Sequence, residues 1–188
     1  MLILLSPAKT LDLKSPRCDE HASLPQHSSD AAELMTVLKA YTLTDLIKSM
    51  KLSNELAEKV AQWHINWSTY DSIKEAIELE AKACAFAMKG EAFKFLDAPS
   101  LNDVQLQYAQ KHLVILSGLY GILRPCDLIM PYRLEMGQTF KVNDTYKSLN
   151  AFWSNVYFQE FSKKLKQQDS KVILNLASEE YSKVVIKS

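Results

Sequence analysis

The sequence contains little glycine, arginine or cysteine and has no net charge, and these shortages exclude some classes of protein and of partner. Its 188 residues include four glycines and three cysteines, and only three of its 22 basic residues are arginines. So little glycine, without any low-complexity tract, excludes collagen-like and flexible repetitive chains. The 22 basic residues balance 22 acidic residues, which removes any global electrostatic argument for a polyanionic partner.

The cysteines and the apolar runs bear on the cellular compartment. Cys18, Cys84 and Cys126 are odd in number, far apart and outside any CxxC pattern, which argues against a disulfide framework and favours a reducing compartment. No apolar run is long enough to span a membrane, and the apolar start at residues 1–5 is too short for a signal peptide. We therefore expect a cytoplasmic protein with no membrane partner. Because no second ligand cluster accompanies Cys18 and His21, we expect no metal, and we expect no cofactor.

Hydrophobic periodicity predicts short strands alternating with helices. Apolar runs at residues 2–5, 113–116 and 171–176 are typical of buried strands, and the apolar run at 184–188 also predicts a strand. Periodicity and capping signals predict helices over residues 30–41 (with a capping box at Asp30 and Glu33), from Thr44, from Ser53, from residue 71, over 100–111 and over 148–167. This pattern predicts an α+β fold with a mixed β-sheet core surrounded by helices, in a single domain over residues 1–188.

The segment Ser6-Pro7-Ala8-Lys9-Thr10, after the first predicted strand, is the first candidate site. Ser-x-x-Lys places a hydroxyl and an amine one helical turn apart, so Lys9 could act as the base for a nucleophilic Ser6. The companion Ser-Asp-Asn and Lys-Thr-Gly motifs of penicillin-recognising enzymes are absent. Alternatively, Lys9 and Thr10 bind an anion together with backbone amides, or the segment is a turn with a surface lysine.

The second candidate site concentrates the scarce residues. Gly118, Gly121 and Gly137 are three of the four glycines, and Arg124 and Arg133 are two of the three arginines. A hairpin at the first two glycines could turn its amides towards a phosphate, as in a helix-hairpin-helix element. Both arginines could clamp a phosphate in bidentate fashion.

Aromatic and acidic residues in the same segment allow two interpretations. Tyr120 and Tyr132 offer surfaces on which bases could stack. Arg133 could instead pair with Glu135 or Asp127 inside the fold, in which case the glycines only form turns.

The third candidate site follows the strand predicted at residues 171–176. Asn175 lies near the end of that strand, and Ser178 opens a helix with two glutamates in its first turn. Those glutamates either perform acid–base work or stabilise the helix start. In open sheets of this kind, ligands bind in a crevice at the carboxyl ends of the strands. Because the loops after Ser6, Ser117 and Asn175 all leave strand ends, we predict that they converge on one site.

The balance of lysines and acidic residues changes along the chain. Residues 51–100 hold six lysines against eight acidic residues, whereas residues 140–188 hold eight lysines against five. A basic last third would suit a nucleic-acid face, although solvated lysines explain it equally well.

Together these blocks resemble the YaaA family of bacterial peroxide-stress proteins. The blocks occur in the family's order over nearly the whole chain: residues 1–11 (with Ser-Pro-Ala-Lys-Thr), 116–121 (Leu-Ser-Gly-Leu-Tyr-Gly), 124–125 (Arg-Pro), 131–137 (Pro-Tyr-Arg-Leu-Glu-Met-Gly) and 175–178 (Asn-Leu-Ala-Ser). The resemblance implies defence against iron and peroxide damage, DNA binding through a basic cleft with a helix-hairpin-helix element, and a fold specific to the family. It also implies a longer chain with a basic segment beyond residue 188. With the apolar run at 184–188, this leads us to expect a C-terminal truncation.

Two functional hypotheses remain open. The first is a DNA-binding stress protein, not an enzyme, that holds double-stranded or structured DNA largely by its phosphates. Its expected contact residues are Lys9, Thr10, Gly118, Gly121, Arg124, Tyr132, Arg133, Asn175 and Ser178. The second is an enzyme acting on a nucleotide or phosphorylated small molecule, with Ser6, Lys9 and Glu135 as the catalytic candidates. An open basic groove would favour DNA, and an enclosed pocket would favour the enzyme.

Overall fold

Four strands form the central sheet of the computed structural model, which describes residues 1–14 and 19–185. They are β1 (Leu2–Leu5), β5 (Leu113–Ser117), β6 (Gly121–Leu123) and β8 (Ile173–Asn175). Their order is β6-β5-β1-β8, with β1 parallel to β5 and to β8, and β6 antiparallel to β5. The predicted mixed sheet is therefore confirmed.

Two small antiparallel ladders lie beside this sheet. One pairs β2 (Thr10–Leu11) with β4 (Met88–Lys89), and the other pairs β3 (Lys82–Ala83) with β7 (Leu128–Ile129). The short helix α5 (Cys84–Ala87) separates β3 from β4, and α4 (Ile73–Glu78) precedes them. The helix predicted from residue 71 is α4, which ends at Glu78, and the chain then alternates between short strands and a single helical turn.

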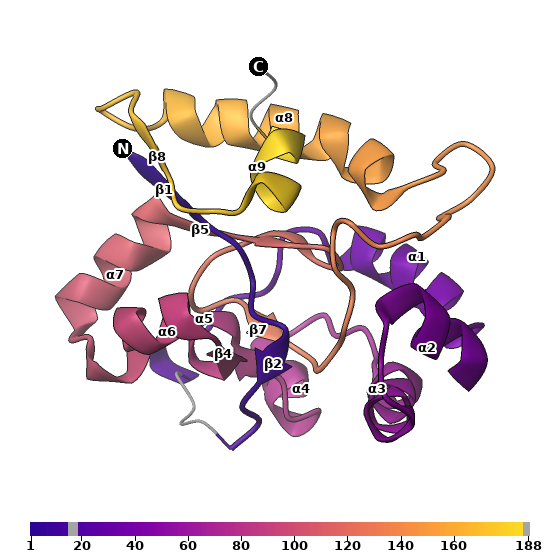
Figure 1. The fold of residues 1–188 in the computed structure, drawn as a ribbon. Helices are drawn as coiled ribbons and strands as arrows, with labels where there is room; N and C mark the ends of the chain where they lie inside the picture. Colours follow the sequence, from indigo (N-terminus) through magenta and orange to yellow (C-terminus); the bar gives the residue numbers. More distant parts are fainter. Residues whose placement is uncertain (15–18, 186–188) are drawn as a thin grey trace.

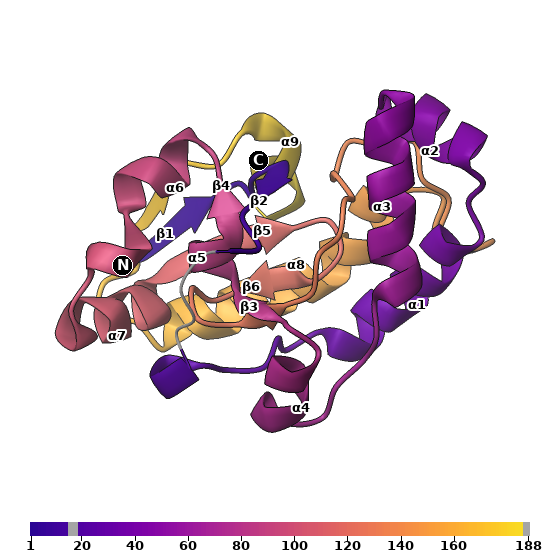
Figure 2. The same ribbon diagram turned by 90° about the horizontal axis from the view of Figure 1, so that it is seen from below.

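Helices cover the sheet on both sides. Figure 1 shows α8 (Leu149–Lys166) above the sheet, and α6 (Glu91–Leu96) and α7 (Asp103–His112) below it. The last helix, α9 (Glu179–Val185), packs against α8. The view from below in Figure 2 places three further helices together at the end of the molecule away from α6 and α7: α1 (Ser28–Lys39), α2 (Leu43–Met50) and α3 (Asn54–Asn66).

Side-chain caps account for most of the helix starts. The Ser53 and Ser148 hydroxyls accept hydrogen bonds from amides in the first turns of α3 and α8, and Thr42 forms a capping box at α2. The predicted capping box at Asp30 is wrong, although its helix exists. α1 begins at Ser28 without a side-chain cap, and the Asp30 carboxylate in its first turn lies 3.2 Å from the His27 ring.

The glycine segment forms a buried β-hairpin between β5 and β6, not a hairpin between two helices. The Trp153 indole donates to the Gly118 carbonyl at 2.9 Å. The Tyr157 hydroxyl lies 2.8 Å from the Ser117 carbonyl oxygen and 3.0 Å from that of Gly121. Gly121 adopts φ +69 with Trp153 against it, so glycine serves turn geometry and close packing at this position.

The strand predicted over residues 184–188 is wrong where the structure describes it. Val184 and Val185 lie in α9 and are buried, and residues 186–188 lie outside the described residues. An apolar run of this length fits the buried face of a helix as well as a strand, so periodicity alone does not separate the two.

Candidate functional site

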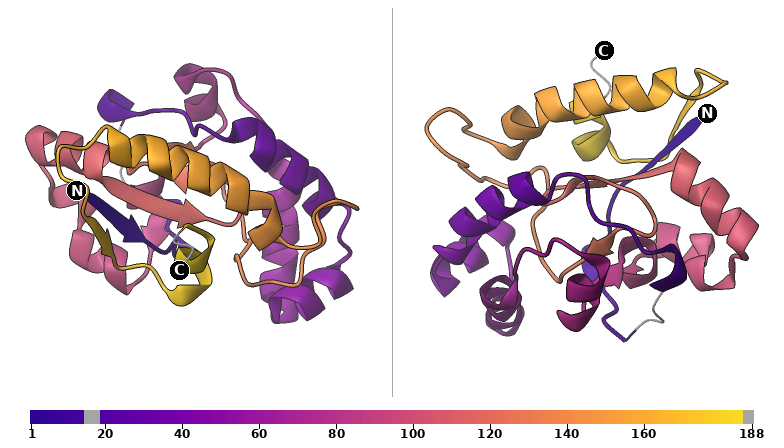
Figure 3. Two further views of the ribbon diagram at one scale, coloured as in Figure 1. Left: turned by 90° about the horizontal axis from the view of Figure 1, so that it is seen from above. Right: turned by 180° about the vertical axis from the view of Figure 1, so that it is seen from behind.

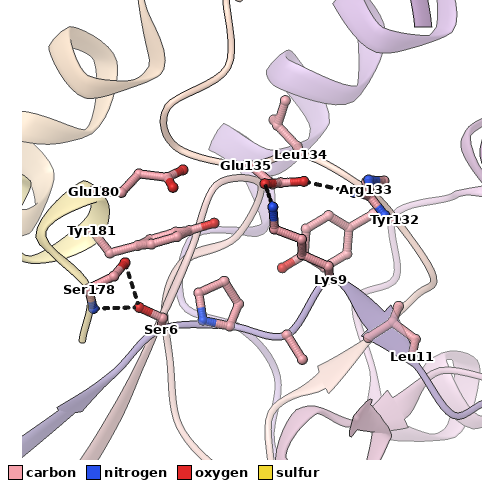
Figure 4. A pocket seen from close by; sticks show the side chains of 12 residues that line it. Ser6, Lys9, Leu11, Tyr132, Arg133, Leu134, Glu135, Ser178, Glu180 and Tyr181 are labelled. Atoms are coloured by element: carbon pink, nitrogen blue, oxygen red, sulfur yellow. Dashed lines mark hydrogen bonds and ion pairs between the residues drawn. The ribbon is translucent and has the colours of Figure 1, made fainter. Parts of the chain in front are cut away.

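A small pocket lies where β1 and β8 end, at the carboxyl edge of the parallel part of the sheet. We call it the strand-end pocket, and its volume is about 150 Å³. Its lining comes from three distant segments: Ser6, Pro7, Ala8, Lys9 and Leu11 after β1; Tyr132, Arg133, Leu134 and Glu135 after β7; and Ser178, Glu180 and Tyr181 around the start of α9. The loops that follow β1 and β8 therefore meet here as predicted (Figure 4), whereas the loop after Ser117, predicted to join them, contributes no residue to the lining.

A carboxylate joins the two cations of this pocket. Glu135 Oε2 lies 2.7 Å from Lys9 Nζ, and Glu135 Oε1 lies 3.0 Å from the Arg133 guanidinium (Figure 4). The Lys9 side chain is 68% exposed, whereas those of Arg133 and Glu135 are largely buried. The Arg133 Nε is buried and has no hydrogen-bond partner among the described residues. The Glu135 carboxylate therefore lies between an exposed ammonium group and a largely buried guanidinium group.

Two serines close the opposite wall of the pocket. Ser6 Oγ accepts a hydrogen bond from the Ser178 amide at 2.9 Å and lies 3.1 Å from Ser178 Oγ. The hydrogen bonds of the Ser6 hydroxyl thus lead to Ser178 and not to Lys9, whose amine is engaged with Glu135. As positioned, Lys9 does not activate Ser6, so a nucleophilic Ser6 would require Lys9 to move.

Two of the residues that line the pocket are buried tyrosines, Tyr132 and Tyr181. The Tyr132 hydroxyl lies 2.7 Å from Ser117 Oγ, and the Tyr181 hydroxyl accepts from the Met136 amide at 3.4 Å. Burial raises the pKa of Tyr132 and of Tyr181, so both phenols stay protonated at neutral pH. Because Tyr132 is almost fully buried, its ring does not offer an open stacking face.

A buried histidine lies behind Arg133. The Arg133 amide points at His64 Nε2 at 3.4 Å, and the Nδ1 of this ring is buried with no partner among the described residues. Burial, with a contribution from the positive charge of Lys39, lowers the pKa of His64 to about 4. His64 is therefore neutral at physiological pH.

Two neighbouring recesses extend the strand-end pocket into a groove. The next recess, of about 420 Å³, shares Lys9, Arg133 and Glu135 with the pocket and reaches Lys51 at the end of α2. The one after it shares Lys51 and adds Lys48. We call the three together the strand-end groove.

The groove carries four cations and three carboxylates. The carboxylates are all engaged internally: Glu135 with Lys9 and Arg133, Asp45 with the Thr42 amide and hydroxyl, and Glu180 with the Gly137 amide. Among the described residues, neither Lys48 nor Lys51 forms an ion pair within 4.0 Å. The groove thus holds a small positive excess in which two ammonium groups are available to a ligand.

Several residues predicted for the site lie elsewhere. Arg124 is held by Asp127, with contacts of 2.7 Å and 3.0 Å between its guanidinium and one carboxylate oxygen, and it does not line the groove. Gly118 packs against the Leu134 carbonyl, and a Cβ there would lie 2.4 Å from that oxygen. Gly121 faces Trp153.

Two further predicted residues sit beside the groove without lining it. Thr10 is exposed on β2, where it pairs with Lys89 of β4. Asn175 ends β8, and its side chain accepts a hydrogen bond from the Ala177 amide.

The sequence interpretation did not include Lys48, Lys51 or His64 in the site. No local motif marks the two lysines, because α2 reaches the groove only through the tertiary fold. His64 had a usable signal: it follows Ala57 and Val60 at helical spacing, which places it on the buried side of α3.

The described part of the chain holds no group of three or more histidine, cysteine, aspartate or glutamate side chains arranged to hold a metal ion. Nor does any helix within residues 1–14 and 19–185 combine the length and the apolar character needed to cross a membrane.

Comparison with known proteins matches the whole chain to one family. The sequence model of the family described as "Peroxide stress protein YaaA" matches residues 1–188. The chain is 43% identical to a UPF0246 protein of Janthinobacterium sp. (strain Marseille) and to one of Polynucleobacter necessarius, over 98% of this chain and 69% of each relative. It is 37% identical to a UPF0246 protein of Francisella tularensis subsp. novicida, over 100% of this chain and 71% of that protein.

The blocks that line the pocket thus lie within a match that covers the full sequence, and the likeness does not depend on any one of them. The chain belongs to the YaaA family of peroxide stress proteins.

Proposed function

We propose that this chain serves the peroxide stress response by binding the phosphate backbone of DNA along the strand-end groove. The observation that carries the proposal is the row of cations in three connected recesses, Lys9 and Arg133 in the first two and Lys51 and Lys48 beyond them. Phosphate contacts of this kind fix a protein on nucleic acid without reading bases. A helix-hairpin-helix element does not enter the proposal, because the glycine hairpin is buried.

The dimensions of the groove favour a polymer over a compact ligand. A cavity of about 150 Å³ has room for a phosphate group with part of a sugar, and not for a base pair. The recess that continues from it towards α2 is larger, at about 420 Å³. A nucleic-acid backbone that places one phosphate by Lys9 and the next ones towards Lys51 would use the whole length.

Glu135 sets the condition for binding. Its carboxylate occupies the space between Lys9 and Arg133, where a phosphate would be best held. A phosphate therefore replaces Glu135 as the partner of Lys9, which is free to move because its side chain is largely exposed. The spacing of the cysteines, which fits no disulfide framework, and the proposed DNA ligand both favour the cytosol as the compartment.

A salt titration tests the proposal. The dissociation constant of a short labelled duplex is measured by fluorescence anisotropy at increasing salt for the wild type, Lys51→Gln and Lys74→Gln. Loss of one phosphate contact lowers the slope of log affinity against log salt by about one unit, so Lys51→Gln should show that decrease.

Lys74 is the matched control, since its side chain is 87% exposed on α4 and lines no part of the groove. Its substitution should leave the slope near that of the wild type. Equal slopes for Lys51→Gln and Lys74→Gln would place the DNA elsewhere on the surface.

A second candidate function is an enzyme acting on a nucleotide or phosphorylated small molecule. The observation that favours it is the meeting of two serine hydroxyls, a lysine and a carboxylate around one small cavity. Thermal-shift measurements with single nucleotides distinguish the two functions. Stabilisation by one mononucleotide, with none by duplex DNA, would select the enzyme.

A further inference from the structure

The strand-end groove has a wall of hydrogen-bonded residues at one end. Its three recesses form a row, because the middle one shares Lys51 with the recess on one side and Lys9 with the strand-end pocket on the other. In the pocket the Ser178 amide donates to Ser6 Oγ at 2.9 Å, and these two residues follow paired strands β1 and β8. The left panel of Figure 3 shows these strands side by side on their way to α9. A polymer that lies along the groove therefore meets the edge of the sheet at this pocket.

The charges of the pocket favour a dianion over a monoanion. Glu135 carries one negative charge and contacts Lys9 at 2.7 Å and Arg133 at 3.0 Å. A phosphodiester inside a nucleic-acid strand also carries one charge, so it has no electrostatic advantage over a carboxylate that the fold already holds in place. The phosphate at the end of a strand is a monoester, and its second ionisation at about pH 6 gives it almost two negative charges at neutral pH. A terminal phosphate therefore displaces Glu135 more effectively than an internal one.

The pocket also holds hydrogen-bond donors that Glu135 does not use. Glu135 contacts the Nη2 of Arg133, and the Nε of the same guanidinium has no partner within residues 1–14 and 19–185. Guanidinium groups bind oxyanions best through two nitrogens, so this fork is only partly used. The hydroxyls of Ser6 and Ser178 lie 3.1 Å apart, and one hydrogen bond between them leaves one hydroxyl proton to donate. The three free oxygens of a terminal phosphate match these donors better than a single carboxylate does.

We propose that the strand-end pocket binds the terminal phosphate of a nucleic-acid strand, so that the chain recognises the ends of DNA. The inference rests on the phosphate binding proposed above and names the part of the DNA that fills the last recess. The terminal phosphate takes the place of Glu135 beside Lys9 and Arg133, and it accepts a hydrogen bond from a serine hydroxyl. The next phosphates of the same strand lie towards Lys51. A cavity of about 150 Å³ suits the terminal phosphate with part of its sugar.

The test compares duplexes of one sequence that differ only at their ends. The ends carry 5′-phosphates, 3′-phosphates or hydroxyl groups, and in a fourth duplex hairpin loops close both ends so that no strand end exists. Fluorescence anisotropy of a label inside each duplex gives the dissociation constants for the chain. We expect a duplex with one of the two kinds of terminal phosphate to bind about tenfold more tightly than the hydroxyl-ended and the loop-closed duplexes, because the added hydrogen bonds are made to a charged group.

Matched variants assign this preference to the pocket. Ser178→Ala removes one of the two hydroxyls and should reduce the preference for the phosphorylated end from about tenfold to about twofold. Lys51→Gln should weaken binding of the phosphorylated and the loop-closed duplexes alike and so keep the preference, because Lys51 lies towards the internal phosphates. Ser100→Ala is the control, since this exposed serine bonds to the Asp97 carbonyl and lines no part of the groove. Circular dichroism checks that each variant folds.

The outcomes separate this inference from the proposed function. Equal affinities for the phosphorylated, hydroxyl-ended and loop-closed duplexes would overturn the inference and leave phosphate binding along the groove in place. A preference that Ser178→Ala and Ser100→Ala both leave unchanged would remove the terminal phosphate from this pocket. Failure of every duplex to bind would overturn the proposed function itself.

A competition experiment distinguishes a strand end from a small phosphorylated molecule. A mononucleotide carries a phosphate monoester but no further phosphates for the recess at Lys51, so it should displace the phosphorylated duplex only at concentrations far above the dissociation constant of that duplex. Displacement at a concentration close to that constant would make a small molecule the occupant of the pocket and would overturn the inference.

Discussion

Replacing His64 with glutamine should make the free energy of unfolding less sensitive to acid. His64 is almost completely buried on α3, and its Nε2 faces the Arg133 amide at 3.4 Å. Burial, with the positive charge of Lys39, holds the pKa of His64 at about 4 in the folded chain, against 6.5 for an unperturbed histidine. Glutamine offers an oxygen to the same amide and does not titrate in this range.

The sign of the effect follows from the protons bound in each state. Between pH 6.5 and about 4 the unfolded chain protonates this histidine while the folded chain does not, so the free energy of unfolding falls as pH falls. One pKa unit corresponds to about 1.4 kcal/mol, so the full interval contributes about 3 kcal/mol, of which about 2 kcal/mol is lost between pH 7 and pH 5.

Urea unfolding at pH 7, 6 and 5 measures this difference. Carboxylates titrate in both proteins, so the quantity of interest is the stability of the wild type minus that of His64→Gln at each pH. We expect this difference to shrink by about 2 kcal/mol from pH 7 to pH 5, which corresponds to a shift in the gap between melting temperatures of roughly 4–8 °C. Parallel pH profiles for the two proteins would refute a buried neutral His64.

Three further substitutions test the packing and charge assignments. Gly121→Ala places a Cβ 2.7 Å from the Trp153 ring at a residue with φ +69. The free energy of unfolding, measured with urea, should fall by about 2–4 kcal/mol. A decrease below about 1 kcal/mol would contradict the packing described. Asp127→Ala leaves the Arg124 guanidinium without its fully buried partner and should cost about 3–5 kcal/mol, whereas a neutral result would show that the pair is not formed. Glu135→Gln removes the negative charge between the two groove cations. It should tighten binding of duplex DNA by roughly fivefold, equivalent to about 1 kcal/mol. An unchanged or weaker affinity would argue against phosphate binding there.

The sequence predicted those elements whose signals are local. The apolar run at residues 2–5 became β1, and the capping serines Ser53 and Ser148 mark the starts of α3 and α8. The meeting of Ser6 and Ser178 was predictable as well, because each follows a parallel strand and such strands end at one edge of a sheet.

The sequence did not predict features that depend on the tertiary fold. Glycine is equally suited to face a ligand and to let two backbones approach, and only the fold shows that Gly118 packs on the Leu134 carbonyl. Arginine is equally suited to phosphate and to a carboxylate, and only the fold places Asp127 against Arg124. Lys51 reaches the groove from a helix far away in sequence, so no spacing rule could connect it with Lys9.

The central claim is that DNA phosphates bind in the strand-end groove, and hydrogen exchange with and without a short duplex tests it most directly. We predict that DNA slows exchange in three segments, residues 6–11, 48–51 and 132–139, which line the connected recesses. Residues 160–171, where Lys163, Lys164, Lys166 and Lys171 gather at the end of α8, should be unaffected. Protection of residues 160–171 without protection of the groove segments would contradict the account.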